Sequence, residues 1–100
     1  MVSKEDVLAK LKTIQDPEIR MNIIDLGLVY DVTIDNDNNV LIKMTFTSPG
    51  CPVGPAFISE IQTKTAEVEG VKSVSVDVVW DPPWSPDRMT EEARMELGLI

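Results

Sequence analysis

Thr47-Ser48-Pro49-Gly50-Cys51-Pro52-Val53-Gly54-Pro55 is the stretch that divides the chain, because an alternating apolar run precedes it and a helical pattern follows it. Its prolines and glycines predict a tight, rigid turn between a strand and a helix. Proline suits the first position of a helix, where its missing N–H is no loss. The stretch therefore predicts a helix that begins at Pro52, or alternatively at Pro55.

Cys51 is the only cysteine of the 100 residues. A helix that begins at Pro52 puts its thiol near the N-cap, beside unpaired N–H groups and the positive end of the helix dipole. A start at Pro55 places the thiol one turn earlier. A thiol near this dipole should ionise at a lower pH than a free cysteine, whose pKa is roughly 8.5. The alternative is a small buried apolar residue; the specialised turn favours a functional thiol. Thr47 and Ser48 could donate hydrogen bonds to its thiolate, or only shape the turn.

Alternation of apolar and polar residues predicts three strands, over residues 28–34, 40–46 and 73–80. The first two should form a hairpin across the polar turn 35–39. Trp80 ends the third strand on its apolar face, so we expect its side chain in the core. The acidic turn also invites a calcium interpretation, but the glycine and glutamate positions of an EF-hand loop are occupied by Val40 and Phe46. A plain turn is therefore favoured.

Helical spacing predicts a first helix that Ser3 caps and that Asp16-Pro17 ends. A central helix follows the Cys51 turn and stops at Gly70, and a short last helix runs from the cap Thr90 to Gly98. The order α-β-β-α-β-α predicts one α+β domain over residues 1–100. Each strand has one apolar and one mostly polar face, so a three-stranded mixed sheet should carry helices on one side, in two layers.

Composition excludes several classes of function. The net charge of −8 without a basic cluster argues against a nucleic-acid partner. No long apolar segment or signal peptide is present, which argues against a membrane partner, and the single cysteine suits a reducing cytoplasm. Histidine is absent, so the chain holds neither a Cys-His nor a Ser-His-Asp arrangement, nor a His-based zinc site.

Acidic residues in two short clusters are further candidates. Asp16, Glu18 and Asp25 could serve as metal ligands or acid–base groups, or could only cap helices and turns. Trp84 follows two prolines in a rigid extended segment, so it could anchor a partner protein or cover the core as a lid.

Four motifs in order resemble one known family: Asp16-Pro17-Glu18, the stretch 24–32, Thr47-Ser48-Pro49-Gly50-Cys51-Pro52 and the stretch 79–84. The chain is similar to the SufT-like and PaaD-like proteins, which are described as metal–sulfur cluster biosynthetic factors. The resemblance spans nearly the whole chain and implies the iron–sulfur cluster assembly domain-like fold. It implies an accessory or carrier factor that matures iron–sulfur proteins in the cytoplasm, with Cys51 as the reactive cysteine. Its partners would be iron–sulfur assembly proteins and apo-clients.

Two hypotheses follow. In the first, the Cys51 thiolate transiently binds iron or an iron–sulfur cluster; because a cluster generally takes four thiolates, one chain cannot hold it stably. A homodimer would still supply only two thiols. In the second, the protein is an adaptor, including PaaD-like service to an oxygenase complex, and Cys51 is structural. An enzyme is less favoured, because a Cys51 nucleophile would have to act without histidine.

Overall fold

A computed structural model describes residues 2–16, 19–47 and 54–98. The elements are α1 (Lys4–Leu11), β1 (Val29–Ile34), β2 (Asn39–Met44), α2 (Gly54–Ala66), β3 (Ser73–Val78), a 3-10 turn (Pro86–Arg88) and α3 (Glu91–Glu96). This order confirms the predicted α+β class and the three-stranded mixed sheet.

The sheet has the strand order β1-β2-β3. β1 and β2 form an antiparallel hairpin in which Val32 pairs with Ile42. β2 and β3 are parallel, and Ile42 pairs with Val76 on that side. Parallel neighbours need a crossover connection, and α2 supplies it. β2 is therefore the central strand, whereas β1 and β3 are the two edges.

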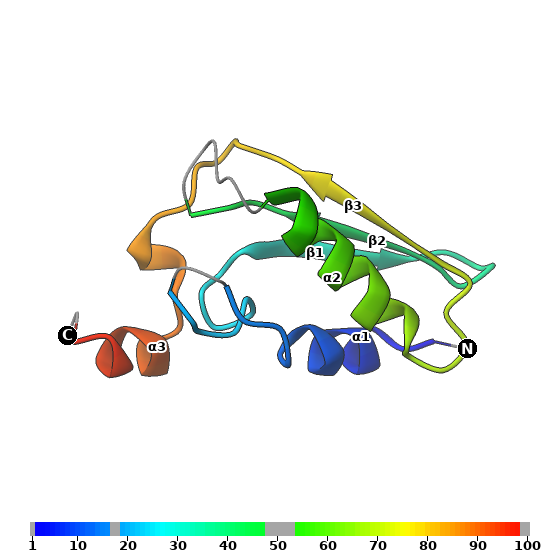
Figure 1. The fold of residues 1–100 in the computed structure, drawn as a ribbon, viewed down its shortest axis with the longest axis horizontal. Coiled ribbons are helices and arrows are strands. Elements are labelled where there is room, and N and C mark those ends of the chain that lie inside the picture. Colours follow the sequence, from blue (N-terminus) through cyan, green and yellow to red (C-terminus); the bar gives the residue numbers. More distant parts are fainter. Residues whose placement is uncertain (1, 17–18, 48–53, 99–100) are drawn as a thin grey trace.

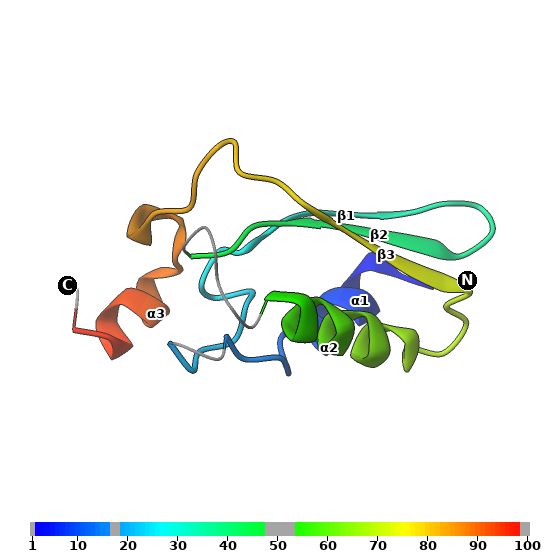
Figure 2. The ribbon, with the colours of Figure 1, turned by 45° about the horizontal axis from the view of Figure 1, so that its top comes forward.

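Helices α1 and α2 lie on the same side of the sheet (Figure 2). The inward face of β2 is fully buried against them through Ile42 and Met44, which meet Leu11 of α1 and Ile61 of α2 in one core cluster. The other face of the sheet is exposed and mostly polar, as the alternation predicted. Helix α3 lies at one end of the molecule, beyond the sheet (Figure 1).

The first helix is shorter than predicted. Ser3 caps α1 by accepting a hydrogen bond from the Asp6 N–H, but the helix ends at Leu11 rather than at Asp16. The chain then turns, and Gln15 forms an isolated antiparallel bridge with Asn22. This bridge draws the residues before Asp16 out of the helix.

The turn between β1 and β2 is held by Asp35, as the plain-turn interpretation expected. Its carboxylate accepts the N–H groups of Asp37 and Asn39, each at 2.9 Å, and the side-chain amide of Asn39. The hydrogen bonds from Asn39 hold the pKa of the Asp35 carboxyl below its usual value. These donors take up the carboxylate oxygens, so the turn is explained without a bound cation.

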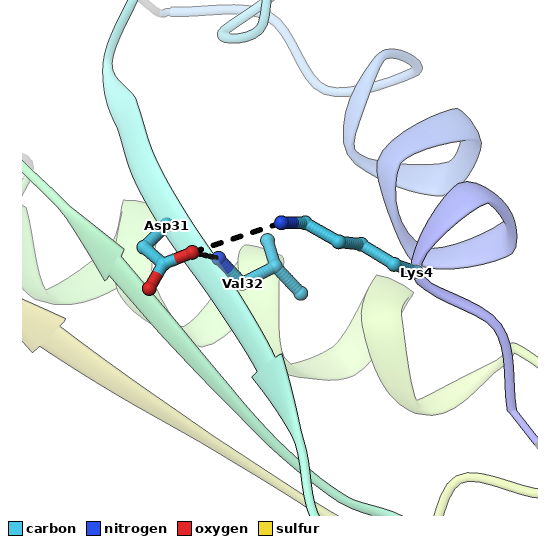
Figure 3. Close-up of polar contacts among 3 residues, drawn as sticks. All are labelled: Lys4, Asp31 and Val32. Carbon is cyan, nitrogen blue, oxygen red and sulfur yellow. Dashed lines mark hydrogen bonds and ion pairs between the residues drawn. The ribbon is translucent and has the colours of Figure 1, made fainter.

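The edge strand β1 carries a bulge between Val29 and Asp31. There the Asp31 carboxylate accepts the Val32 N–H at 2.9 Å and lies 3.8 Å from Lys4 Nζ of α1 (Figure 3). The ion pair is exposed and weak, but the bulge and the acidic side chain interrupt this edge. No helix in the described residues is long and apolar enough to cross a membrane.

Candidate functional site

An apolar cavity of about 320 Å³ lies just beyond the C-terminal ends of β2 and β3. Of the described residues, its walls are Phe46, Thr47, Trp80, Pro83 and Trp84. We call it the aromatic cavity. Its volume is at the lower end of the range typical of small-molecule pockets, and aromatic walls of this kind also receive single side chains of partner proteins.

Phe46 forms the inner wall of the aromatic cavity. It follows β2, is 9% exposed and stacks on Phe57 of α2, with 5.9 Å between the ring centroids. The Trp80 ring meets Phe46 edge-on at 5.8 Å. Such aromatic pairs add specific attraction to the burial of their area. Phe46 therefore links the end of the sheet to α2 and to the chain after β3.

Trp80 is 47% exposed, so the prediction that it belongs to the core is wrong. The sheet pairing ends at Val78, and the Val79 N–H makes the last bond to Met44 C=O. Beyond that bond the chain leaves the sheet, so the alternation no longer directs the next side chain inward. Trp80 instead covers Phe46 with one edge and presents its remaining surface to solvent.

Trp84 turns inward. Its indole Nε1 donates a hydrogen bond of 2.6 Å to Leu26 C=O, and the side chain is half-buried against the core. Nearby, the Tyr30 hydroxyl donates to Pro82 C=O at 2.8 Å, and the Arg88 guanidinium lies 4.6 Å from the Tyr30 ring centroid. These contacts support the lid interpretation of Trp84. Partner binding by Trp84 stays a prediction.

The C-terminal segment packs on the Asp25-Leu26-Gly27 motif. Gly27 has φ of 77°, and an added Cβ would lie 2.2 Å from Arg88 C=O. Asp25 accepts the Asn22 side-chain amide through its carboxylate at 2.8 Å and the Thr90 N–H through its carbonyl at 2.9 Å. This motif therefore carries a clear packing role, and the Asp25 carboxylate lies outside the aromatic cavity.

Asp16 is 4% exposed and also lies away from the cavity walls. Its Oδ1 accepts the Ile19 N–H at 2.9 Å, and its carbonyl accepts the Arg20 N–H at 2.8 Å. Both bonds join Asp16 to the residues at positions 19 and 20, which fits the capping role that the sequence left open for it beside a direct one. Glu18, its companion in the motif, lies outside the described residues.

Cys51 and Ser48 also lie outside the described residues, whereas the two ends of their stretch are described. Thr47 lines the aromatic cavity, and α2 begins at Gly54, where an added Cβ would lie 3.4 Å from the Phe46 ring. Pro55 falls in the first turn of α2, where proline is tolerated. Both ends of the Cys51 stretch therefore border the cavity wall.

Sequence reasoning missed Phe46 and Pro83 as site residues. The sequence pattern indicates only that Phe46 is the last inward-facing residue of a strand. Its position immediately before the Thr47 turn is the signal that could have marked it as a site residue. The described residues bring together no group of three or more acidic or cysteine side chains that could hold a metal ion. A metal site built by this part of the chain alone is therefore not supported.

Comparison with known proteins places these features in context. Residues 4–78 match the family described as "Iron-sulfur cluster assembly protein". The "Fe-S protein maturation auxiliary factor" of Porphyromonas gingivalis is 42% identical over 98% of this chain and 93% of that protein. The "Fe-S protein maturation auxiliary factor YitW" of Bacillus subtilis is 42% identical over 96% of this chain and 94% of its own length. The crystal structure of the DUF59 domain from Bacillus anthracis is 42% identical, covers 97% of this chain and 92% of that chain, and superposes with a TM-score of 0.90.

Proposed function

This chain belongs to the family of iron–sulfur cluster assembly proteins, and we propose that it acts through the Cys51 thiolate as an auxiliary factor in the maturation of iron–sulfur proteins. The choice of this site rests on the position of the aromatic cavity. Its wall borders both described ends of the stretch that holds the only cysteine. The accessory role follows from the family, and the choice of Cys51 is our extension of it.

The aromatic cavity suits such a thiol. Aromatic walls exclude water, and a charge interacts more strongly with its partners where water is scarce. Iron and sulfide are the cargo in this proposal, and the stretch that holds the thiol starts and ends at residues that border this apolar surface. Thr47, one of the two hydroxyl residues on the strand side of the stretch, lies at the cavity wall.

Binding of a cluster must be transient and shared. One chain supplies one thiol, whereas a cluster generally takes four. The remaining ligands would come from an assembly protein, from an apo-client or in part from a second copy of this chain. We therefore propose a carrier between partners and not an enzyme with its own turnover, and the single cysteine suits a reducing cytoplasm.

A second function is favoured by one observation. Trp80 is 47% exposed beside the aromatic cavity, which is the kind of side chain that anchors protein–protein contacts. In this alternative the protein is an adaptor and Cys51 packs as an apolar residue. The two functions differ in what they require of the thiol.

A complementation experiment in the source organism tests the proposal. The gene is deleted, and the wild type, Cys51→Ser or Trp80→Ala is restored at matched protein levels. Aconitase activity reports on iron–sulfur maturation, and a dehydrogenase without a cluster is the control enzyme. We expect Cys51→Ser to behave like the deletion for aconitase alone.

Two outcomes would contradict the proposal. Full aconitase activity with Cys51→Ser, combined with failure of Trp80→Ala, would favour the adaptor. Normal aconitase in the deletion strain would exclude a general role in cluster maturation. Serine keeps nearly the size of cysteine, so circular dichroism of the purified variant separates loss of the thiol from loss of the fold.

A further inference from the structure

Strand β3 offers an open edge. It pairs with β2 on one side, and no other strand of the described residues pairs with it on the other. Val78 pairs with Met44 in the parallel register, and the Val79 N–H donates to Met44 C=O. A parallel ladder of this register directs the backbone groups of Val74, Val76 and Val78 away from β2. No hydrogen bond found among the described residues uses these N–H and C=O groups, so they can pair with an added strand.

The two edges of the sheet are not equivalent. On β1 a bulge interrupts the ladder, and the Asp31 carboxylate and Lys4 of α1 meet beside it (Figure 3). Bulges and edge charges are the devices by which proteins block strand addition. β3 has a continuous register from Ser73 to Val78 without such an irregularity. The open edge is therefore on the β3 side.

The β3 edge leads directly into the aromatic cavity. Trp80 follows β3 by two residues and forms a cavity wall together with Pro83 and Trp84. Backbone pairing and a pocket for one side chain thus lie in line, which is the arrangement used in recognition of extended peptides by β-augmentation. Figure 1 shows β3 at the outer edge of the sheet, with the chain beyond it running toward the end where α3 lies.

The charge of this surface indicates the charge of the partner segment. Residues 73–87 contain Asp77, Asp81 and Asp87, all exposed, and neither lysine nor arginine, whereas Lys43 of β2 is the cross-strand neighbour of Asp77, and Lys72 and Arg88 flank the segment. The whole chain carries a net charge of −8, so two copies repel each other, whereas a basic segment is attracted. The half-buried side chains of β3 face the helices, and Asp77 is exposed on the opposite face.

We propose that the β3 edge and the aromatic cavity bind an extended, basic segment of a partner protein, which adds as an antiparallel strand and places one aromatic side chain in the cavity. Antiparallel addition is chosen because it is the more stable pairing. In this orientation the aromatic residue of the segment lies at its N-terminal end, next to Trp80. Its cationic side chains alternate with apolar ones and share a face with Asp77. This inference goes beyond the proposed function, because such binding requires neither Cys51 nor a metal.

A synthetic peptide tests the proposal on the full chain. The probe is acetyl-Phe-Lys-Val-Arg-Val-Lys-amide, titrated into the protein labelled with ¹⁵N. We expect amide shift changes in residues 73–84 and in the cavity-wall residues Phe46 and Thr47. Binding should be at least about tenfold weaker when the Phe of the peptide is replaced by Ala. Replacing its Lys and Arg by Glu should abolish binding. The reversed peptide, with Phe at its C-terminal end, should bind more weakly.

N-methylated peptides test the backbone pairing separately from the side-chain contacts. N-methyl groups on one alternating set of peptide residues block the hydrogen bonds to β3, whereas the other set points away. Binding should be lost with one set and kept with the other. Trp80→Ala should weaken binding, while Leu41→Ala, which removes a side chain of similar exposure from β2, should not.

Three results would overturn the proposal. Equal binding of both N-methylated peptides would exclude strand addition. Shift changes centred on β1 or on the open face near Leu41 would place the peptide elsewhere. A dimer of the protein alone in equilibrium sedimentation, with β3 amides protected from hydrogen exchange, would show that a second copy occupies the edge.

Discussion

The indole Nε1 of Trp84 donates a 2.6 Å hydrogen bond to the backbone carbonyl of Leu26 and so joins two motifs that lie 58 residues apart. Around this bond, the Thr90 N–H reaches Asp25 C=O, and Arg88 packs directly against Gly27. The C-terminal segment is thereby fixed to the connector before β1. Trp80, which belongs to the same segment, is consequently held beside Phe46.

The Trp84 hydrogen bond should contribute measurably to stability. Trp84→Phe keeps an aromatic ring but leaves Leu26 C=O without this donor, so we expect a loss of about 1–2 kcal/mol in the free energy of unfolding. Trp80→Phe is the matched control and should change it by no more than about 0.5 kcal/mol, because Trp80 is half exposed. Urea denaturation followed by circular dichroism measures both. A larger loss for Trp80→Phe would contradict the assigned roles.

Gly27 should tolerate no side chain. Its φ of 77° costs a substituted residue about 1–2 kcal/mol, and contact of the new Cβ with Arg88 C=O adds to this cost. Gly98→Ala is the control, because Gly98 has φ of 76° and nothing within 4 Å of an added Cβ. We expect Gly27→Ala to lower the midpoint of urea denaturation clearly more than Gly98→Ala. Equal effects would show that Arg88 can move away from the new Cβ at no cost in the free energy of unfolding.

The fold was predictable because its signals are local. Alternation in β1 and β2 and the cap Ser3 each act within a few residues, and the structure agrees with them, whereas α2 ends at Ala66, before the predicted stop at Gly70. The first helix was overestimated because the bridge between Gln15 and Asn22 is a tertiary feature. Its apolar spacing continues past Leu11 although the helix does not.

The two tryptophans show where the sequence stops being informative. Trp80 continues the alternation of β3 and was therefore placed in the core, yet the last ladder bond is made by Val79 and the strand has already ended. The inward direction of Trp84 depends on a carbonyl at Leu26, which no local pattern near Trp84 reveals. For Asp25 the sequence left acid–base chemistry, metal binding and turn capping open, and the contacts of Asp25 in the structure are those of a turn.

Phe46 and Trp80 should be energetically coupled. Their rings meet edge-on at 5.8 Å, so a double-mutant cycle with Phe46→Leu and Trp80→Ala should give a coupling of about 0.5–1.5 kcal/mol in the free energy of unfolding. The pair Phe46→Leu and Leu41→Ala is the control and should be additive within about 0.5 kcal/mol. An additive Phe46–Trp80 cycle would mean that Trp80 does not rest on Phe46 in solution.

Substitutions of Asp16 can distinguish a structural role of the Asp16-Pro17-Glu18 motif from a direct functional role. Its Oδ1 accepts the Ile19 N–H while the side chain is buried, so Asp16→Ala leaves that donor without its acceptor and should cost about 1–2 kcal/mol of stability. Asp16→Asn retains an oxygen at this position but removes the charge, and we expect a smaller loss. If Asp16 only shapes the turn, a strain carrying Asp16→Asn should keep aconitase activity near that of the wild type at equal protein level. Loss of aconitase activity with a folded Asp16→Asn protein would instead show that the carboxylate itself takes part in maturation.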